Sequence, residues 1–497
     1  ADRTGRLIAH FPTCGAFVPF GAGLRVLYGF HMKAYETTKI GHHRGNPRLW
    51  LQGRKASRAG FHPGKRFRVR KDETRSMLVL EIDADGERGV SRKIAGAGEL
   101  PVIDINSAED LAVLTGFTRV RVISQKLRIV ILPCAVELAK KERLARLRAK
   151  IAAAAAISVG SISHGGGILD HALHSGMKAA GVKSRLAFAN DIRPELLEHA
   201  SAHNDAWDDE TVSLAAPMQL LAFDAWAMDR IDKVEVLCAG IPCSGASRSG
   251  RAKRGAGHAE EHPEVGHLIA PFLAIVAKTQ PAVVLVENVV PYRTSASMFI
   301  LRHQLRDLGY QVHEAVLQAS EWNVLENRER LCMVATTEGL DFDFALLSRP
   351  VKVERRIAEI LETVAPDDDR WSTMAGLLAK QDRDREKGNS FKMQIVTADS
   401  TSGPTITKGY AKVRSTDPKL RSSHDPSLLR QFTLLEHARL KGVPAFLIRG
   451  LGLTLGHELL GQSVCYQPFE AVGELLGEFI LADAGVLRAP ARLAANE

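Results

Sequence analysis

Short apolar runs alternate with helical stretches between about residues 157 and 338, and this alternation limits the fold more than any other feature of the chain. Six of these runs predict strands, at residues 157–160, 186–189, 234–239, 283–286, 311–317 and 331–335. Strands that alternate with helices are typical of a parallel sheet covered by crossover helices. A chain of 497 residues has room for this sheet and for further domains. We therefore predict an α/β fold for this segment.

The composition is that of a globular protein with a polyanionic partner. Apolar residues make up 45% of the chain and charged residues 25%, which excludes general disorder. The formal net charge of +9 favours a nucleic-acid partner. The chain has six scattered cysteines, Cys14, Cys134, Cys238, Cys243, Cys332 and Cys465. They form no CxxC pair and no zinc spacing, so we expect a reducing cytoplasm and no metal site. No apolar run reaches membrane-spanning length, so we expect no membrane association.

An internal repeat lies near the N-terminus, at residues 48–135. Gly60-Phe61 and Gly116-Phe117 occupy equivalent places, 56 residues apart. Each copy predicts a strand, a short helix, a Gly-Phe turn and a pair of strands, and two interleaved copies close a small β-barrel without exposed edges. The segment resembles the swapped-hairpin barrels of AbrB-like and SymE-like bacterial DNA-binding proteins. DNA binding and a scaffold or dimerisation role both remain open for it.

The rest of the chain divides by composition. Residues 1–47 are predicted to be an N-terminal extension, with 1–31 as leader material. Residues 136–156 predict a connecting helix with its charged residues facing out, namely Glu137, Lys140, Lys141, Glu142, Arg143, Arg146 and Arg148. Residues 157–338 form the predicted α/β domain. Residues 339–425 are polar and basic and predict a separate small domain, and helical periodicity returns over 426–497.

Two features suggest a nucleotide-like ligand at the first strands. Gly165-Gly166-Gly167 follows the strand at 157–160, where glycines let the backbone approach a cofactor at a helix N-terminus. A plain tight turn is the alternative. The next strand leads to Asp191, whose carboxylate can bind ribose hydroxyls or can cap a helix.

A thiol and a carboxyl group follow two neighbouring predicted strands. Pro242-Cys243 ends the apolar run at 234–241, and Glu287-Asn288 ends the run at 283–286. Exposure and nearby basic residues such as Arg248 favour the reactive thiolate of Cys243, whereas Cys238 lies within a strand and is expected in the core. Covalent attack on a pyrimidine ring needs a nucleophile of this kind, together with a group that stabilises charge on a ring nitrogen. A structural loop cysteine is the alternative.

Arg328 and Arg330 alternate just before the strand at 331–335, so their side chains point to one side. Paired guanidinium groups at this place can hold a phosphate or a pyrimidine carbonyl oxygen. The alternative is a solvated strand end.

Taken in order, these motifs resemble those of the DNA (cytosine-5)-methyltransferases. The matching segments are Gly240-Ile241-Pro242-Cys243, Glu287-Asn288-Val289, Glu321 through Ala335, Arg430 through Arg439 with Pro444, and Gly461-Gln462-Ser463-Val464. The resemblance implies a Rossmann-like class I methyltransferase domain over 157–338, completed by 426–497. It also implies a target-recognition domain at 339–425.

The resemblance further implies S-adenosylmethionine as cofactor and double-stranded DNA as partner. The catalytic residues it implies are Cys243, Glu287, Asn288, Arg328 and Arg330. The residues implied to bind the cofactor are Gly165, Gly167, Asp191, Pro242, Gln462 and Ser463. Those implied to bind DNA are Ser247, Arg248, Lys408 and Arg414. A monomer is expected in the bacterial cytoplasm, in a restriction–modification setting or encoded by a phage or mobile element.

The chain departs from the family pattern at several positions. Ser163 replaces an aromatic residue in the glycine motif, Glu326 aligns with a usual Gln, Leu325 with a Pro, and Glu235 with a common Asp. These departures keep two other functions open: cytosine-5 methylation of tRNA, and a DNA-binding regulator with a degenerate methyltransferase fold.

Overall fold

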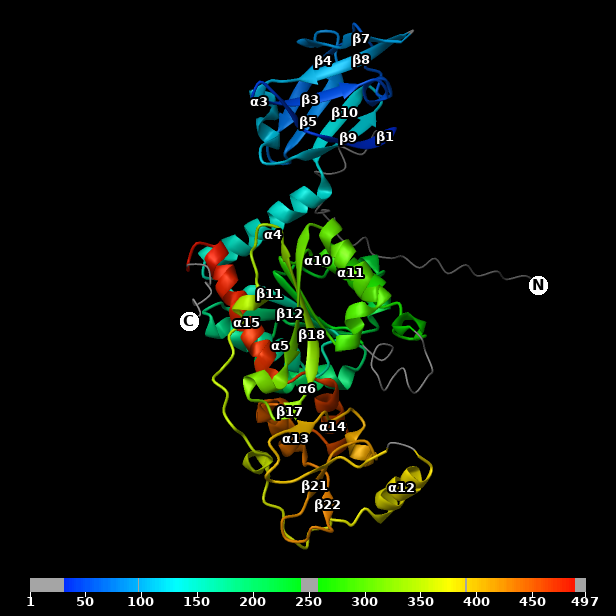
Figure 1. Cartoon of the computed structure of the whole chain (residues 1–497). Coiled ribbons are helices and arrows are strands. Elements are labelled where there is room, and N and C mark those ends of the chain that lie inside the picture. Colours follow the sequence, from blue (N-terminus) through cyan, green and yellow to red (C-terminus); the bar gives the residue numbers. More distant parts are fainter. Residues whose placement is uncertain (1–30, 97, 243–257, 389–390, 488–497) are drawn as a thin grey trace, which may run out of the picture. The chain divides into compact units, whose positions relative to one another are not determined.

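The computed structural model describes residues 31–96, 98–242, 258–388 and 391–487 (Figure 1). The chain separates into two compact units, residues 1–138 and 139–497. Each unit has its own sheets and its own hydrophobic core. Across the part of the chain that is described, no helix is both long enough and apolar enough to cross a membrane.

A seven-stranded sheet forms the centre of the unit 139–497. Its strand order is β13-β12-β11-β14-β15-β18-β16. The strands are β11 (Ile157–Ile162), β12 (Ser184–Asp191), β13 (Val212–Ala215), β14 (Val236–Gly240), β15 (Val283–Asn288), β16 (Tyr310–Gln318) and β18 (Glu329–Thr337). Neighbouring strands are parallel except that β18 runs antiparallel to both β15 and β16. The predicted α/β fold with a mainly parallel sheet is therefore confirmed for this unit.

All six predicted strands are present, and each is longer than its apolar run or shifted by a residue or two. Strand β13 was not predicted, because this four-residue edge strand is mostly exposed and has no continuous apolar run. Central strands bury both faces and are therefore recognised from their apolar side chains.

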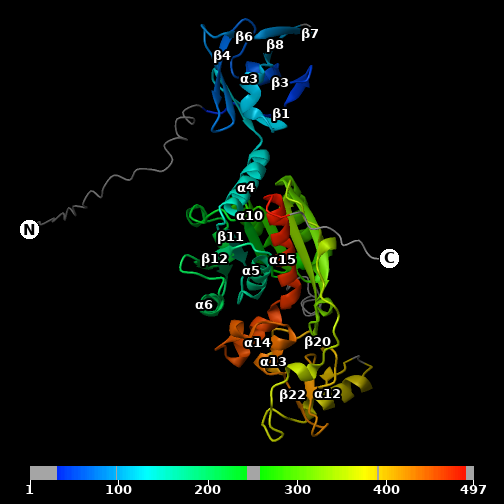
Figure 2. The same ribbon diagram turned by 90° about the vertical axis from the view of Figure 1, so that its left-hand side faces the viewer.

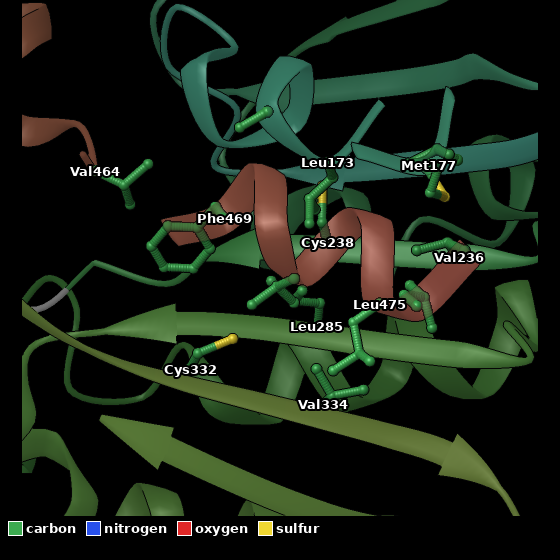
Figure 3. Close-up of a cluster of buried hydrophobic side chains, with 14 of the residues drawn as sticks. Leu173, Met177, Val236, Cys238, Leu285, Cys332, Val334, Val464, Phe469 and Leu475 are labelled. Carbon is green, nitrogen blue, oxygen red and sulfur yellow. The ribbon is translucent and has the colours of Figure 1, made fainter. Parts of the chain in front are cut away.

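One face of the sheet is covered by α5 (Ile168–Ala179) and α15 (Tyr466–Asp483), which lie side by side (Figures 1 and 2). Close packing of the two helices depends on glycine. A Cβ atom on Gly176 would come within 1.9 Å of the Glu470 carbonyl oxygen, and one on Gly473 within 2.6 Å of the Leu173 carbonyl oxygen. Figure 3 shows Phe469 and Leu475 of α15 with strand residues such as Leu285 in one buried cluster. The C-terminal helix thus completes the core formed by the central strands.

The opposite face of the sheet packs against α10 (Ile269–Thr279) and α11 (Ala296–Asp307). Phe272 of α10 and Leu301 of α11 are fully buried in a second core with Leu237 and Val284 of the sheet. The sheet is therefore buried on both faces, as its apolar strands require.

The predicted connecting helix is α4 (Ala135–Ala152), but its charged residues do not all face out. Arg143 is 1% exposed, and its guanidinium lies 4.0 Å from the ring centre of Tyr310. Arg146 donates to the carboxylate of Glu235, which is completely buried, at 2.7 Å. The prediction is wrong for these two arginines because they lie on the packed side of the helix together with the buried Leu144 and Leu147.

Residues 339–425 have few regular elements. They contain α12 (Ala375–Glu386) and the short strands β19 (Ile395–Val396), β20 (Gly403–Pro404) and β21 (Lys419–Arg421). A small core holds them together, formed by Ile357, Ile360, Val396, Ile406, Tyr410 and Leu420 with Leu325, Phe432 and Leu440 from the flanking segments. We call residues 339–425 the recognition segment, after the role that the sequence resemblance implies for them.

The N-terminal unit is built from two copies of one structural repeat. The first copy contains β1 (Ala34–Lys39), β2 (Gly41–His43), β3 (Asn46–Gln52), α2 (Arg54–Ser57), β4 (Arg66–Asp72) and β5 (Met77–Ile82). The second contains β6 (Arg88–Gly89), β7 (Ser91–Ala95), β8 (Gly98–Ile105), α3 (Ala108–Leu111), β9 (Arg119–Gln125) and β10 (Arg128–Pro133). Gly60 and Gly116 have nearly equal positive φ angles of 88° and 83°. The glycines of the two predicted Gly-Phe turns therefore both lie in the left-handed region.

The two copies exchange strands. β3 pairs with β8 and β5 with β10, while β1 pairs with β9 and β6 with β4. These pairings join one copy to the other in a sheet of six strands and a sheet of four. Strands β1 and β2 lie before residue 48, so the prediction of an extension over 1–47 is wrong for residues 34–47. The predicted leader, 1–31, lies almost wholly outside the described residues.

Candidate active site

One cleft lies at the carboxyl ends of the parallel strands, where open α/β sheets bind their ligands. Ten of the residues predicted from the sequence line it, namely Gly165, Asp191, Pro242, Glu287, Arg328, Arg330, Lys408, Arg414, Gln462 and Ser463. Two others, Gly167 and Asn288, lie beside the cleft without lining it. The fold thus gathers residues from along more than half of the chain.

The glycine loop between β11 and α5 leaves its backbone open to the cleft. Gly165 has a φ of +57°, and a Cβ atom there would meet nothing within 4 Å. A Cβ atom on Gly166 would come within 2.3 Å of Leu459 in α14 (Leu453–Gln462). Gly167, with a φ of +73°, leaves room for the side chains of Asn204 and His164. Gly165 therefore faces the cleft, whereas Gly166 and Gly167 permit close packing.

The carboxylate of Asp191 ends β12 and joins two loops. Its Oδ2 accepts a hydrogen bond from Gly165 N at 2.8 Å, and its Oδ1 accepts one from Arg193 N at 3.0 Å. Arg193 is the N-cap residue of α6 (Pro194–His203) and no side chain caps this helix, so Asp191 holds the turn before α6 without being the helix cap considered as its alternative role. Each oxygen keeps a further lone pair, and the side chain still lines the cleft, so it can also accept a ligand hydroxyl.

An apolar wall beside Asp191 escaped the sequence analysis. Ile192, Pro217, Met218 and Leu459 line this end of the cleft, and Ile192 is 64% exposed. The sequence signal was weak, since an apolar residue after a strand usually belongs to the core. A flat apolar surface next to a carboxylate suits a ring attached to a sugar.

Glu287 and Arg330 form an ion pair at the opposite end of the cleft. Arg330 Nε lies 2.7 Å from Glu287 Oε1, and both side chains are largely buried. Glu287 is in register with Gly240 on the neighbouring strand β14, whose chain continues to Pro242. Asn288 is buried and donates from Nδ2 to the carbonyl oxygen of Ile241 at 3.1 Å. The carboxyl group of Glu287 thus lies next to the loop that leads to residue 243.

Arg328 is also buried at the cleft, with 4% of its surface exposed. Its Nη2 donates to the carbonyl oxygen of Gly461 at 3.2 Å, and its Nε has no hydrogen-bond partner among the described residues. A solvated strand end would be exposed, so the alternative considered for this arginine is wrong. A buried guanidinium with an unused donor is suited to an anion or a carbonyl oxygen.

The recognition segment supplies one wall of the cleft. Thr405, Thr407, Lys408 and Arg414 line it. A Cβ atom on Gly461 would come within 2.4 Å of the Thr407–Lys408 backbone, so this glycine lets α14 touch the segment directly. Basic and hydroxyl side chains from residues 339–425 therefore face the same cleft as Glu287.

The family model for "C-5 cytosine-specific DNA methylase" matches residues 172–478. The chain belongs to this family. It is 26% identical over 259 residues to Type II methyltransferase M1.ScrFI of Lactococcus lactis subsp. cremoris, covering 50% of this chain and 63% of that protein. It is 25% identical over 264 residues to Type II methyltransferase M.DsaV of Dactylococcopsis salina, covering 51% and 71%. The match thus spans about two thirds of each relative.

Solved structures support the same fold. The S. pombe Dnmt2 methyltransferase has a TM-score of 0.51 at 20% identity, with 64% of this chain and 98% of that chain covered. The Entamoeba histolytica methyltransferase EhMeth has a TM-score of 0.50 at 17% identity, with 66% and 98% covered. The unit 139–497 is thus consistent with the class I methyltransferase fold.

Within the C-5 cytosine-specific methylase family, the nucleophile is expected at Cys243. Cys243, Ser247 and Arg248 lie outside the described residues, which end at Pro242 on this loop and resume at residue 258. Cys238, the rival thiol, is completely buried in β14, and burial raises its pKa well above the ordinary value. Cys238 is therefore a core residue, as predicted.

Proposed function

We propose that this chain transfers a methyl group from S-adenosylmethionine to carbon 5 of cytosine in double-stranded DNA. The observation that carries the proposal is the single cleft lined at one end by Gly165 and Asp191 and at the other by Glu287 and Arg330. A methyltransferase needs its donor and its acceptor in one cavity. The family match and the Type II methyltransferase relatives point to the same reaction.

The residues at the first end fit a nucleoside cofactor. Gly165 leaves the backbone open, the carboxylate of Asp191 can accept ribose hydroxyls, and Ile192 offers an apolar surface for a base. Gln462 and Ser463, at the C-terminal end of α14, also line the cleft and are proposed to contact the cofactor. When bound, S-adenosylmethionine supplies an electrophilic methyl group.

The residues at the second end fit a cytosine taken out of the duplex stack. In the proposed reaction, the thiolate of Cys243 bonds to ring carbon 6 and makes carbon 5 nucleophilic. Glu287, oriented by Arg330, stabilises the ring at N3, and Asn288 holds the loop before Cys243 through Ile241. After methylation, loss of the carbon-5 proton and expulsion of the sulfur restore the aromatic ring.

The recognition segment is proposed to contact the duplex. Lys408 and Arg414 reach the cleft from this segment and can bind phosphates or base edges beside the flipped nucleotide. Ser247 and Arg248, close to Cys243 in the sequence, are also proposed to contact DNA.

Transfer of a tritiated methyl group to duplex DNA and to tRNA tests the proposal. We expect label in DNA from the full chain, and none from the Cys243→Ala variant. Label in tRNA alone would replace the proposed substrate. No label in either nucleic acid, together with tight DNA binding, would favour a regulator with a degenerate site. If DNA is labelled, bisulfite sequencing of DNA from cells that express the protein reports the methylated sequence.

For the N-terminal unit we propose a second DNA contact, of the kind that swapped-hairpin barrels of AbrB-like and SymE-like proteins make. Residues 31–138 contain 20 Lys and Arg residues against 12 Asp and Glu residues, a net charge of +8, while the whole chain has +9. The positive charge of the protein is thus concentrated in this unit. A positive surface binds DNA by releasing counterions.

The salt dependence of DNA binding separates this role from a scaffold. Lys65→Gln, Arg70→Gln and Lys93→Gln remove exposed positive charges from the repeat unit of the full chain. If the unit binds phosphates, the slope of log affinity against log salt falls by about 0.9 per lost contact. A scaffold or dimerisation role leaves that slope unchanged.

A further inference from the structure

Glu326, one of the positions where the chain departs from the family pattern, is a completely buried carboxylate behind the cleft. It lies in β17 (Glu326–Asn327), two residues before Arg328. Its Oε2 accepts a hydrogen bond from Lys441 Nζ at 2.6 Å, and Lys441 is also completely buried. A buried charge needs such a partner, because an isolated one is strongly disfavoured. The acidic residue at 326 is therefore matched by a basic residue 115 positions later.

The same carboxylate holds two other segments. Its Oε1 accepts a hydrogen bond from Ile406 N in the recognition segment at 2.8 Å, and Cys465, just before α15, lies 3.3 Å from Oε2. β17 also pairs with β20 of the recognition segment. Glu326 thus connects the recognition segment, the end of α13 (Leu434–Leu440) near Lys441, and the start of α15.

Arg328 lines the cleft, and its guanidinium lies near the carboxylate of Glu326. Its Nη1 lies 3.8 Å from Glu326 Oε1, which is longer than a direct hydrogen bond. Burial alone would raise the pKa of Glu326, but Lys441 and Arg328 outweigh burial and lower it to about 2. Glu326 is therefore an anion whose charge is neutralised by Lys441, and the charge of Arg328 remains available to the cleft.

We propose that Glu326 and Lys441 form a positioning pair, in which Lys441 occupies the carboxylate so that Arg328 stays directed at the cleft beside the recognition segment. The inference rests on the proposed function, because it concerns the group that Arg328 holds during methyl transfer. Neither Glu326 nor Lys441 lines the cleft. Both residues therefore act through Arg328 and Ile406.

Lys441→Met tests the pair. Without its lysine, the buried carboxylate can pair fully with Arg328 and draw the guanidinium away from the cleft. We expect kcat to fall about tenfold to a hundredfold at 20 °C in protein that is folded by circular dichroism. KM for S-adenosylmethionine should change by less than about twofold, since that end of the cleft is untouched. Lys441→Gln, which removes the positive charge that neutralises Glu326 and so leaves Arg328 as its nearest cation, serves as the second variant if Lys441→Met does not fold.

A second substitution should reverse the loss. Adding Glu326→Gln to Lys441→Met keeps an acceptor for Ile406 N but removes the charge that attracts Arg328, so kcat should return to within about threefold of wild type. Lys140→Met is the matched control: Lys140 Nζ lies 2.6 Å from Glu338 in an exposed pair away from the cleft. Its kcat should equal that of wild type.

The results separate the two proposals. A wild-type chain that methylates no nucleic acid overturns the proposed function. An active wild type with unchanged kcat in folded Lys441→Met, or in folded Lys441→Gln when Lys441→Met is unfolded, overturns the positioning pair alone. If kcat in every variant falls only in proportion to the fraction of folded protein, the pair stabilises the fold without positioning Arg328, and the proposal is likewise overturned.

Discussion

Replacing Arg146 with methionine should weaken the attachment of α4 to the sheet. The guanidinium of Arg146 donates three short hydrogen bonds to residues just before β14 and β15. The acceptors are Glu235 Oε1 at 2.7 Å and the carbonyl oxygens of Val234 and Gln280 at 2.6 Å each. Glu235 is 0% exposed. Methionine fills a similar volume but donates no hydrogen bond, so the substitution leaves these three acceptors without that donor.

The structure also determines how much stability Arg146→Met should lose. Removing one partner of a buried ion pair costs about 3–5 kcal/mol. Glu235 keeps Lys150 Nζ at 2.7 Å and Ser158 N at 2.7 Å, which favours the low end. We therefore expect Arg146→Met to lower the free energy of unfolding of the unit 139–497 by about 3 kcal/mol. At about 2 °C per kcal/mol, Tm falls by about 6 °C.

Arg148→Met is the matched control on the same helix. Arg148 donates to Asp483 at 2.7 and 2.8 Å, but its side chain is 47% exposed. An exposed pair contributes at most about 1 kcal/mol, so its loss should lower Tm by no more than about 2 °C. The comparison therefore varies the burial of the arginine and keeps the chemical change constant.

Thermal unfolding followed by tryptophan fluorescence is a suitable assay. Trp207, Trp226, Trp322 and Trp371 belong to the unit 139–497, and only Trp50 lies in the other unit. The emission therefore reports mainly on the unfolding of the unit 139–497. Equal Tm losses for Arg146→Met and Arg148→Met would refute the reasoning. So would a loss of about 6 °C for Arg146→Met that disappears at high salt, because salt screens exposed ion pairs much more than buried ones.

Three further outcomes are expected. Cys243→Ala should abolish methyl transfer, measured with tritiated cofactor, whereas Cys238→Ala should keep it, because that thiol is buried in the core. Burial raises the pKa of Asp170 to about 7, so the folded state binds a proton that the unfolded state has lost, and stability falls as the pH rises from about 4 to 7. Asp170→Asn should therefore raise the free energy of unfolding, and with it Tm, more at pH 8 than at pH 5; the gain in free energy is at most about 4 kcal/mol, at about 1.4 kcal/mol per pKa unit. An equal gain in Tm at both pH values would contradict this. Gly166→Ala should raise the Kd for S-adenosylmethionine in calorimetry by forcing Leu459 aside, and adding Leu459→Ala should reverse the effect, since the clash would be removed.

The sequence alone was sufficient for the central sheet and for most of the cleft. Strands such as β14 and β15 are buried on both faces, so their apolar runs identify them without further information. Parallel strands place their carboxyl ends at one edge, which is why Asp191 and Glu287 could be expected near each other. The edge strand β13 was missed, because an exposed strand has no such run.

The sequence also predicted an internal repeat, and Gly60 and Gly116, at equivalent places in it, both have a positive φ that other residues avoid. It did not reveal that β1 and β2 belong to the first copy. Their side chains are mostly exposed, and they are held by main-chain pairing with β9 and β3. Hydrogen bonds between backbones leave little trace in side-chain composition.

Only the tertiary structure decided which charged residues are buried. Helical spacing predicts Arg146 to be an ordinary surface residue, and the sequence shows Glu326 only as an acidic residue in place of a usual Gln. In the folded chain Arg146 meets Glu235, 89 positions away, and Glu326 meets Lys441, 115 positions away. The physical reason is that an apolar side chain is recognised by its own hydrophobicity, whereas a buried charge is explained only by the partner that the fold brings to it.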